Sequence, residues 1–151
     1  LLHETATFVW LQDTYSLEEL KAFSINVLEA HAASACSRRV VEFAHEQGHD
    51  PTHSLTYIDN TTAESINENG RTQTDGLAAV NARRLEWLIA AGVHQKSKRV
   101  ASIDNDVADL LSRGRIDEAL RFATEANLPT LRIHLSAAER DTSWVPTTWQ
   151  P

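Results

Sequence analysis

The sequence predicts one α/β domain in which at least some strands run parallel. Short runs of β-branched and aromatic residues alternate along the chain with longer segments that have helical periodicity and capping residues. Strands that are connected through helices need crossovers, and crossovers favour parallel pairing. A length of 151 residues suits a single domain with its own hydrophobic core.

The N-terminal part is expected to form a strand and a short helix. Residues 5–11, TATFVWL, are rich in the β-branched and aromatic side chains that are typical of strands. Ser16 and Glu19 have the Ser-x-x-Glu spacing of a capping box, which predicts a helix over 17–23.

A longer helix is expected next, from Ile25 to about Gln47. Ser24 can cap its first turn, and Gly48 followed by Pro51 ends it. Its predicted buried stripe consists of Ile25, Leu28, Ala32 and Ala35.

The middle of the chain is expected to contain a buried strand and two helices. Residues 54–58, SLTYI, form a compact apolar run, and a short helix is predicted over 61–69. A longer helix is predicted over 76–91, ending at Gly92. Its predicted inward side chains are Leu77, Val80, Leu85, Leu88 and Ile89.

The C-terminal part is expected to add a strand over 98–102 and helices over 105–113 and 116–126. Gly114 ends the first of these helices, and Asn127 with Pro129 ends the second. Beyond residue 140 we expect an extended tail, so that the domain covers 1–140 and the tail 141–151.

Composition excludes several functional classes. The net charge of −7 argues against binding nucleic acid through a broad basic face. The single cysteine, Cys36, excludes an intramolecular disulfide and a multi-cysteine zinc site, so an intracellular compartment is expected and Cys36 is predicted to be a packed thiol. No run approaches the ~20 apolar residues of a membrane-spanning helix, so no membrane partner is expected.

Three acidic residues stand at the ends of predicted elements. Glu29 lies in the first turns of the long helix, Asp59 directly follows the apolar strand, and Asp109 lies within the helix over 105–113. Ligands usually bind at the carboxyl ends of strands in α/β sheets, and converging carboxylates suit Mg²⁺. The alternative is structural: a helix-dipole partner, a turn cap and a solvated side chain.

The amino-acid sequences of three segments resemble those of the ribonuclease H-like domain of retroelement reverse transcriptases. These segments are INVLE at 25–29, DNTTA with the following IN at 59–67, and NDVADLLSR at 105–113. They occur in the order of the family, and the resemblance covers about residues 24–135.

The resemblance implies a ribonuclease H-like mixed sheet flanked by helices, with four acidic residues that bind two Mg²⁺ or Mn²⁺ ions. It makes Glu29, Asp59 and Asp109 the second, third and fourth acids. It implies that the substrate is the RNA strand of an RNA–DNA hybrid and that the polymerase domain of the same polyprotein is a partner. The residues expected to contact substrate are Asn60, Thr61, Arg99 and Asn105.

Two departures from the family pattern bear on activity. No residue here matches the family's first acid or its strand, so the domain is expected to be N-terminally truncated and incomplete as a nuclease. In the family fold that strand is central, so the strand over 55–58 is expected to keep an unpaired edge. Arg99 stands where the family tends to have a histidine, and arginine cannot act as a base near neutral pH.

Two other functions remain open from the sequence. The first is a catalytically inactive ribonuclease H-like module that folds or binds beside a polymerase. The second is a zinc metalloprotease, because residues 45–49, HEQGH, match the His-Glu-x-x-His motif. That motif needs a helix that continues through His49, whereas Pro51 favours an earlier end. His45, His49 and His53 could also bind a transition metal adventitiously.

Overall fold

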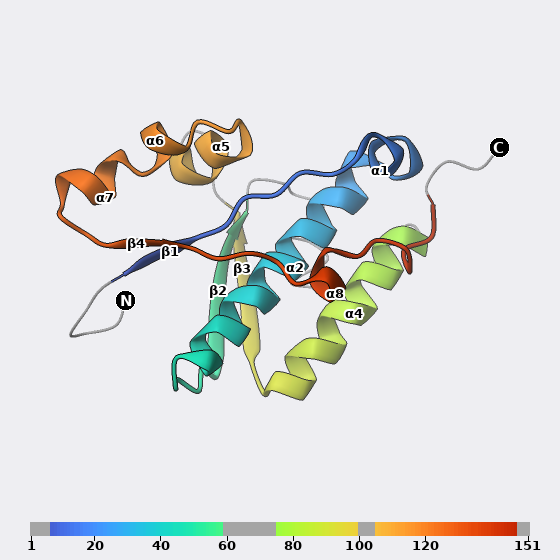
Figure 1. Cartoon of the computed structure of the whole chain (residues 1–151). Helices are drawn as coiled ribbons and strands as arrows, with labels where there is room; N and C mark the ends of the chain where they lie inside the picture. Colours follow the sequence, from blue (N-terminus) through green and yellow to red (C-terminus); the bar gives the residue numbers. More distant parts are fainter. Residues whose placement is uncertain (1–6, 59–74, 100–104, 148–151) are drawn as a thin grey trace.

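Two pairs of parallel strands and two long helices organise the protein (Figure 1). The structure is a computed structural model that describes residues 7–58, 75–99 and 105–147. Within these residues no helix is long and apolar enough to cross a membrane. The elements are β1 (Phe8–Trp10), α1 (Leu17–Ala22), α2 (Ile25–Glu46), β2 (His53–Ile58), α4 (Asp75–Ala91), β3 (His94–Arg99), α5 (Asp106–Ser112), α6 (Ile116–Ala119), α7 (Arg121–Glu125), β4 (Thr130–Arg132) and α8 (Ala137–Arg140).

Most of the predicted elements are confirmed, including α1 with its capping box at Ser16 and α2 with its cap at Ser24. The predicted helix over 61–69 lies outside the described residues. The single helix predicted over 116–126 is wrong: Leu120, at φ −96° and ψ 4°, separates α6 from α7. Its backbone leaves the helical region without any glycine or proline that could have indicated a break.

β2 and β3 form a parallel pair whose register runs from His53 opposite His94 to Ile58 opposite Arg99. Helix α4 lies in the crossover between them. The strand predicted over 98–102 therefore begins four residues too late, because β3 starts at His94. Its inward positions include Gln95 and the buried Ser97, so the strand has no apolar alternation to reveal its start.

β1 pairs in parallel with β4, not with β2. β4 was not predicted, because its three residues are all exposed and no apolar run marks them. The Phe8 ring meets the Phe122 ring edge to face, with centroids 5.0 Å apart, which fastens this pair of strands to α7.

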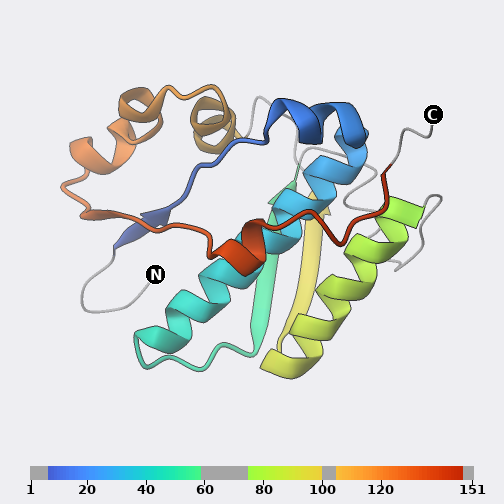
Figure 2. The same cartoon turned by 45° about the vertical axis from the view of Figure 1, so that its right-hand side comes forward.

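Helices α2 and α4 lie side by side against one face of the β2–β3 pair (Figures 1 and 2). The predicted stripes were partly wrong: Ile25 is 63% exposed and Ile89 is 79% exposed. The helices turn a different face inward because they bury polar groups that the apolar pattern disregards, such as His31 and Arg84. The main core cluster consists of Phe23, Val27, Leu28, Ala30, Leu77, Val80 and Val145.

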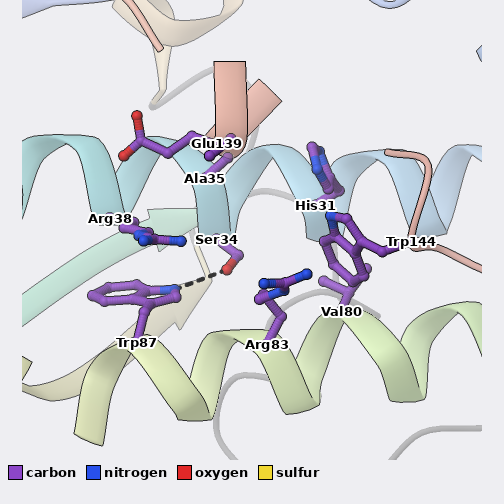
Figure 3. A pocket seen from close by; sticks show the side chains of 10 residues that line it. His31, Ser34, Ala35, Arg38, Val80, Arg83, Trp87, Glu139 and Trp144 are labelled. Carbon is purple, nitrogen blue, oxygen red and sulfur yellow. Dashed lines mark hydrogen bonds between the residues drawn. The ribbon is translucent and has the colours of Figure 1, made fainter. Parts of the chain in front are cut away.

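A buried hydrogen bond also joins the two helices. Trp87 Nε1 donates to Ser34 Oγ at 3.1 Å (Figure 3). The cavity beside this bond has a volume of about 30 Å³, which is room for about one water molecule. Arg83 and Trp144 close its other end, with the guanidinium carbon 4.6 Å from the ring centroid.

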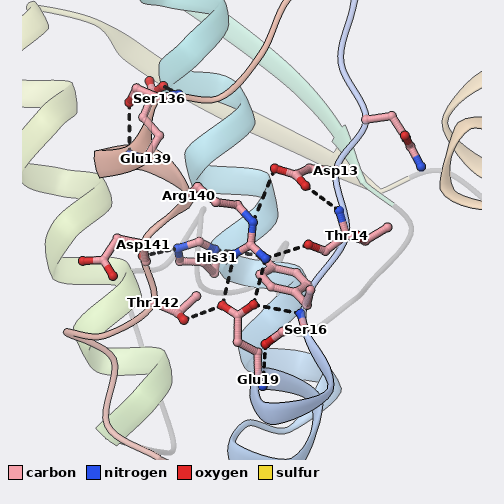
Figure 4. A network of polar contacts seen from close by, with 12 residues as sticks. Asp13, Thr14, Ser16, Glu19, His31, Ser136, Glu139, Arg140, Asp141 and Thr142 are labelled. Carbon is pink, nitrogen blue, oxygen red and sulfur yellow. Dashed lines mark hydrogen bonds and ion pairs between the residues drawn. The ribbon is translucent and has the colours of Figure 1, made fainter.

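Arg140 connects the C-terminal segment to the N-terminal one (Figure 4). Its guanidinium donates to both carboxylate oxygens of Glu19, at 2.7 and 3.0 Å, and to the Thr14 carbonyl at 2.6 Å. Asp13 completes the ion pair at 3.3 Å. The hydrogen bonds from Arg140 hold the pKa of Glu19 down at about 2.

The segment expected to be an extended tail contributes to the core. Val145 is buried in the main cluster, and Trp144 packs against that cluster. The boundary at residue 140 therefore has to move, because residues as far as Val145 pack with α2 and α4. The sequence pattern was misleading because only two residues between 141 and 147, Trp144 and Val145, are apolar.

His31 is buried where α2 meets the C-terminal segment. Its Nε2 donates to the Asp141 carbonyl at 3.0 Å, so in the neutral ring Nδ1 is an acceptor, 2.7 Å from the Tyr15 hydroxyl. Burial lowers the pKa of His31 because the charged ring would lose its hydration.

We predict that stability falls as the pH drops below the ordinary histidine pKa of about 6.5. In that range the unfolded chain binds a proton that the buried neutral His31 excludes, so acid favours unfolding. The slope should not exceed about 1.4 kcal/mol per pH unit for one proton. Urea unfolding between pH 5 and 8 measures it. His31→Gln should flatten the slope, whereas His49→Gln, at an exposed position, should leave it in place; equal slopes in all three proteins would contradict the assignment.

Gly76 marks the closest approach of α4 to α2. A Cβ there would lie 3.1 Å from Val27 Cγ2 and 3.4 Å from the Pro146 carbonyl oxygen. We predict that Gly76→Leu lowers the free energy of unfolding by about 1–3 kcal/mol, because the added side chain overpacks the core. Ala78→Leu, at an exposed position of the same helix, is the matched control for thermal unfolding. Equal melting temperatures for the two variants would show that this contact is not tight.

Candidate functional site

The carboxyl ends of β2 and β3 form the edge at which the site is expected. Because the strands are parallel, Ile58 and Arg99 end side by side. Asp59 follows Ile58 directly in the sequence. Asp59, Asn60 and Thr61 lie outside the described residues.

The N-terminal turns of α2 lie at the same edge. Ile58 packs against the core cluster that contains Val27 and Leu28, and Glu29 is the next residue of the helix. The Oε2 atom of Glu29 is buried. Glu29 is one turn before Ala32 and Ala33 and so shares their face of α2.

α5 borders this edge across a cavity of about 400 Å³. Ala108 and Leu111 of α5 line the cavity together with Thr56 and Ile58 of β2. From α2 the lining residues are His31, Ala32, Ala33, Cys36 and Ser37. Both α5 and the face of α2 that includes Ala32 and Ala33 thus border one cavity beside the end of β2.

Asp109 lies on α5 next to the residues that line the cavity. Its carboxylate is 3.3 Å from Nε of Arg113, one turn later, and its side chain is 39% exposed. Asp109 also contributes its carbonyl oxygen to the hydroxyl of Ser112, at 2.7 Å. The structure therefore brings the α5 segment to the edge, with the Asp109 side chain held by an arginine.

The described residues do not by themselves assemble a metal centre. Across residues 7–58, 75–99 and 105–147, no three His, Cys, Asp or Glu side chains are grouped closely enough to hold an ion. Glu29 and Asp109 are two of the three predicted ligands, and the third, Asp59, is outside this part of the chain. The predicted three-acid cluster stays a prediction.

Two of the predicted substrate contacts can be located. Arg99 is the last residue of β3, at the expected edge. Asn105 precedes the first turn of α5 and makes no side-chain capping hydrogen bond there. Asn105 is therefore adjacent in sequence to α5, which borders the cavity, and Arg99 ends the strand that pairs with β2.

The sequence did not predict the cavity. Its walls come from segments that are distant in the chain, among them residues 11–15, α2 and Leu135. Cys36 lines it, and burial raises the pKa of this thiol to about 11, which agrees with an unreactive packed cysteine. In the described sheet β2 pairs with β3 alone, so its other edge has no strand partner there.

The arrangement of the HEQGH segment does not suit a zinc protease. α2 ends at Glu46, and Gly48 has a φ of +83° that turns the chain away from the helix axis. His49 therefore leaves the helical face of His45, and its amide donates instead to the Ala44 carbonyl at 2.9 Å. His45 Nδ1 lies 3.9 Å from a carboxylate oxygen of Asp50.

Comparison with known proteins gives no relative for this chain. No protein-family model, no curated protein and no solved structure matches it.

Proposed function

We propose that this protein is a ribonuclease H-like domain that binds divalent metal and acts on the RNA strand of RNA–DNA hybrids. One observation carries the proposal: the elements that bear Glu29 and Asp109 border a single cavity at the strand end that Asp59 follows. These residues are separated by 30 and 50 positions in the sequence, so local structure alone would not bring their elements together. The parallel pairing of β2 with β3 and the α4 crossover between them agree with the proposal.

The chemistry of the donors fits Mg²⁺ or Mn²⁺. Carboxylate oxygens are the hard ligands that these ions prefer, and Glu29, Asp59 and Asp109 would hold them. When bound, such ions activate water and stabilise the leaving oxygen of a phosphodiester.

The residues around the acids suit an RNA strand. Arg99 is the last residue of β3, and arginine binds phosphate through two parallel hydrogen bonds. The amide of Asn105 can donate to and accept from a ribose 2′-hydroxyl, which distinguishes RNA from DNA. Arg99 stays charged at neutral pH and so would position substrate without moving a proton.

An inactive binding module is the second candidate. The ion pair between Asp109 and Arg113 favours it, because a carboxylate that is neutralised by arginine is a weaker metal ligand. Cleavage distinguishes the two candidates, since the module would bind hybrid without hydrolysing it.

The test compares the chain alone with a chain extended at its N-terminus by a strand that carries an aspartate. We predict that the extended chain cleaves the RNA strand with Mg²⁺ or Mn²⁺ and leaves 5′-phosphate ends, and that the chain alone does not. Asp59→Asn or Asp109→Asn should reduce cleavage by more than the ~100-fold that loss of a residue supporting a metal ligand costs, because an amide oxygen lacks the charge that the ion needs. Gel analysis of a labelled hybrid measures the products.

Asp106→Asn is the matched control, because Asp106 is an exposed acid in the first turn of the same helix. His45→Ala and Glu46→Ala should also leave cleavage unchanged. If the extended chain is inert but binds hybrid, the inactive module replaces the nuclease. If His45→Ala removes a zinc-dependent peptidase activity, both are wrong.

A further inference from the structure

The β2–β3 pair has one face that the described helices leave open. α2 and α4 cover the other face (Figures 1 and 2). Ser54, Thr56 and Ile58 are the less exposed positions of β2, and Ile58 packs against the main core cluster on that side. Side chains alternate across a strand, so the remaining positions face outward together. These six residues are all exposed: His53, Leu55 and Tyr57 of β2, and His94, Lys96 and Lys98 of β3.

The side chains on the open face form two columns of different chemistry, one on β2 and one on β3. The register places Leu55 beside Lys96 and Tyr57 beside Lys98. β3 therefore presents two lysines in a row, whose Cα atoms are about 6.6 Å apart along the strand. β2 presents an apolar and an aromatic side chain alongside them, and Leu55 and Tyr57 are 54% and 52% exposed. Two large, half-exposed hydrophobic side chains beside lysines indicate a binding surface.

A pair of histidines continues both columns at the amino ends of the strands. The rings of His53 and His94 lie with centroids 5.6 Å apart and planes inclined by 31°. His53 precedes Leu55 by two residues on the same face of β2 and so adds a second aromatic ring to the β2 column. Neither strand contains an acidic residue, although the whole chain has a net charge of −7. The charge of this face is therefore opposite to that of the molecule, and its complement is an anion.

We propose that this face binds a single strand of nucleic acid that lies along β2 and β3. The phosphates follow Lys96 and Lys98, and the bases stack on Tyr57, Leu55 and the His53 ring. Sequence-tolerant binders of single strands combine such cationic tracks with aromatic platforms. An acidic peptide would use the lysines but leave the Leu55 and Tyr57 column uncovered. The proposal goes beyond the nuclease function, because it needs neither the three acids nor a metal ion.

Binding is tested with the 151-residue chain and fluorescent oligonucleotides, oligo(dT) and oligo(rU), in EDTA by anisotropy. We predict that Lys96→Gln with Lys98→Gln weakens binding roughly tenfold at low salt and reduces the slope of log affinity against log salt by about 1.4, since two phosphate contacts are lost. Tyr57→Ala should also weaken binding roughly tenfold, because a stacked base is lost, whereas Tyr57→Phe should bind like the unmodified chain.

Lys21→Gln with Arg121→Gln is the matched control, because it removes the same charge from exposed positions on α1 and α7. Equal affinities for this control and the Lys96/Lys98 variant would overturn the proposal. So would competition by poly-glutamate that equals competition by the oligonucleotide. Photocrosslinking of an iodouridine oligonucleotide to the unmodified chain supplies a test without variants: crosslinks within 53–58 or 94–99 support the proposal, and crosslinks confined to other segments overturn it.

Discussion

The parallel pairing of β2 with β3 determines where both proposed sites lie. Because the strands run in the same direction, their carboxyl ends meet at one edge, where Ile58 packs against α2 and α5 borders the cavity. The same register places Leu55 and Tyr57 beside two lysines on the open face. One pairing therefore underlies both the proposed metal site at the strand ends and the proposed binding face of the same small sheet. If the strands were antiparallel, Ile58 and Arg99 would end at opposite edges, and the nuclease proposal would lose its basis.

Contacts with the C-terminal segment hold α2, the helix that carries Glu29, in place. His31, two residues after Glu29, donates to the Asp141 carbonyl. Arg140 binds Glu19 in α1, the helix that precedes α2. These contacts join residues more than 100 positions apart and fix the first turns of α2. Acid therefore favours unfolding in two ways. Below the ordinary histidine pKa the unfolded chain binds a proton that the buried His31 excludes, and below the ordinary glutamate pKa it binds a proton that the paired Glu19 excludes down to a pH of about 2.

Local signals in the sequence predicted most helices. Features that depend on contacts between distant segments could not be predicted in this way. Ser16 and Ser24 located the starts of α1 and α2 because capping depends on adjacent residues. β4 and the start of β3 were missed because their residues are polar and gain stability from a distant partner. Ile89 was placed inward by apolar spacing, whereas the real inner face of α4 accommodates Arg84. For the site, the rule that ligands bind at strand ends predicted the carboxyl end of β2, but the cavity beside that end is lined by five distant segments and had no local signal.

The convergence of Glu29, Asp59 and Asp109 is tested most directly by Mn²⁺, which broadens the NMR signals of nearby nuclei without any need for catalysis. Titration of the ¹⁵N-labelled 151-residue chain should broaden the amide signals of Glu29, Ile58 and Asp109 together, at the same Mn²⁺ concentration. Asp59→Asn should abolish this joint broadening, and Asp106→Asn should preserve it. Broadening that is confined to the segment from His45 to His49, or that reaches Glu29 without Asp109, would contradict a shared metal site.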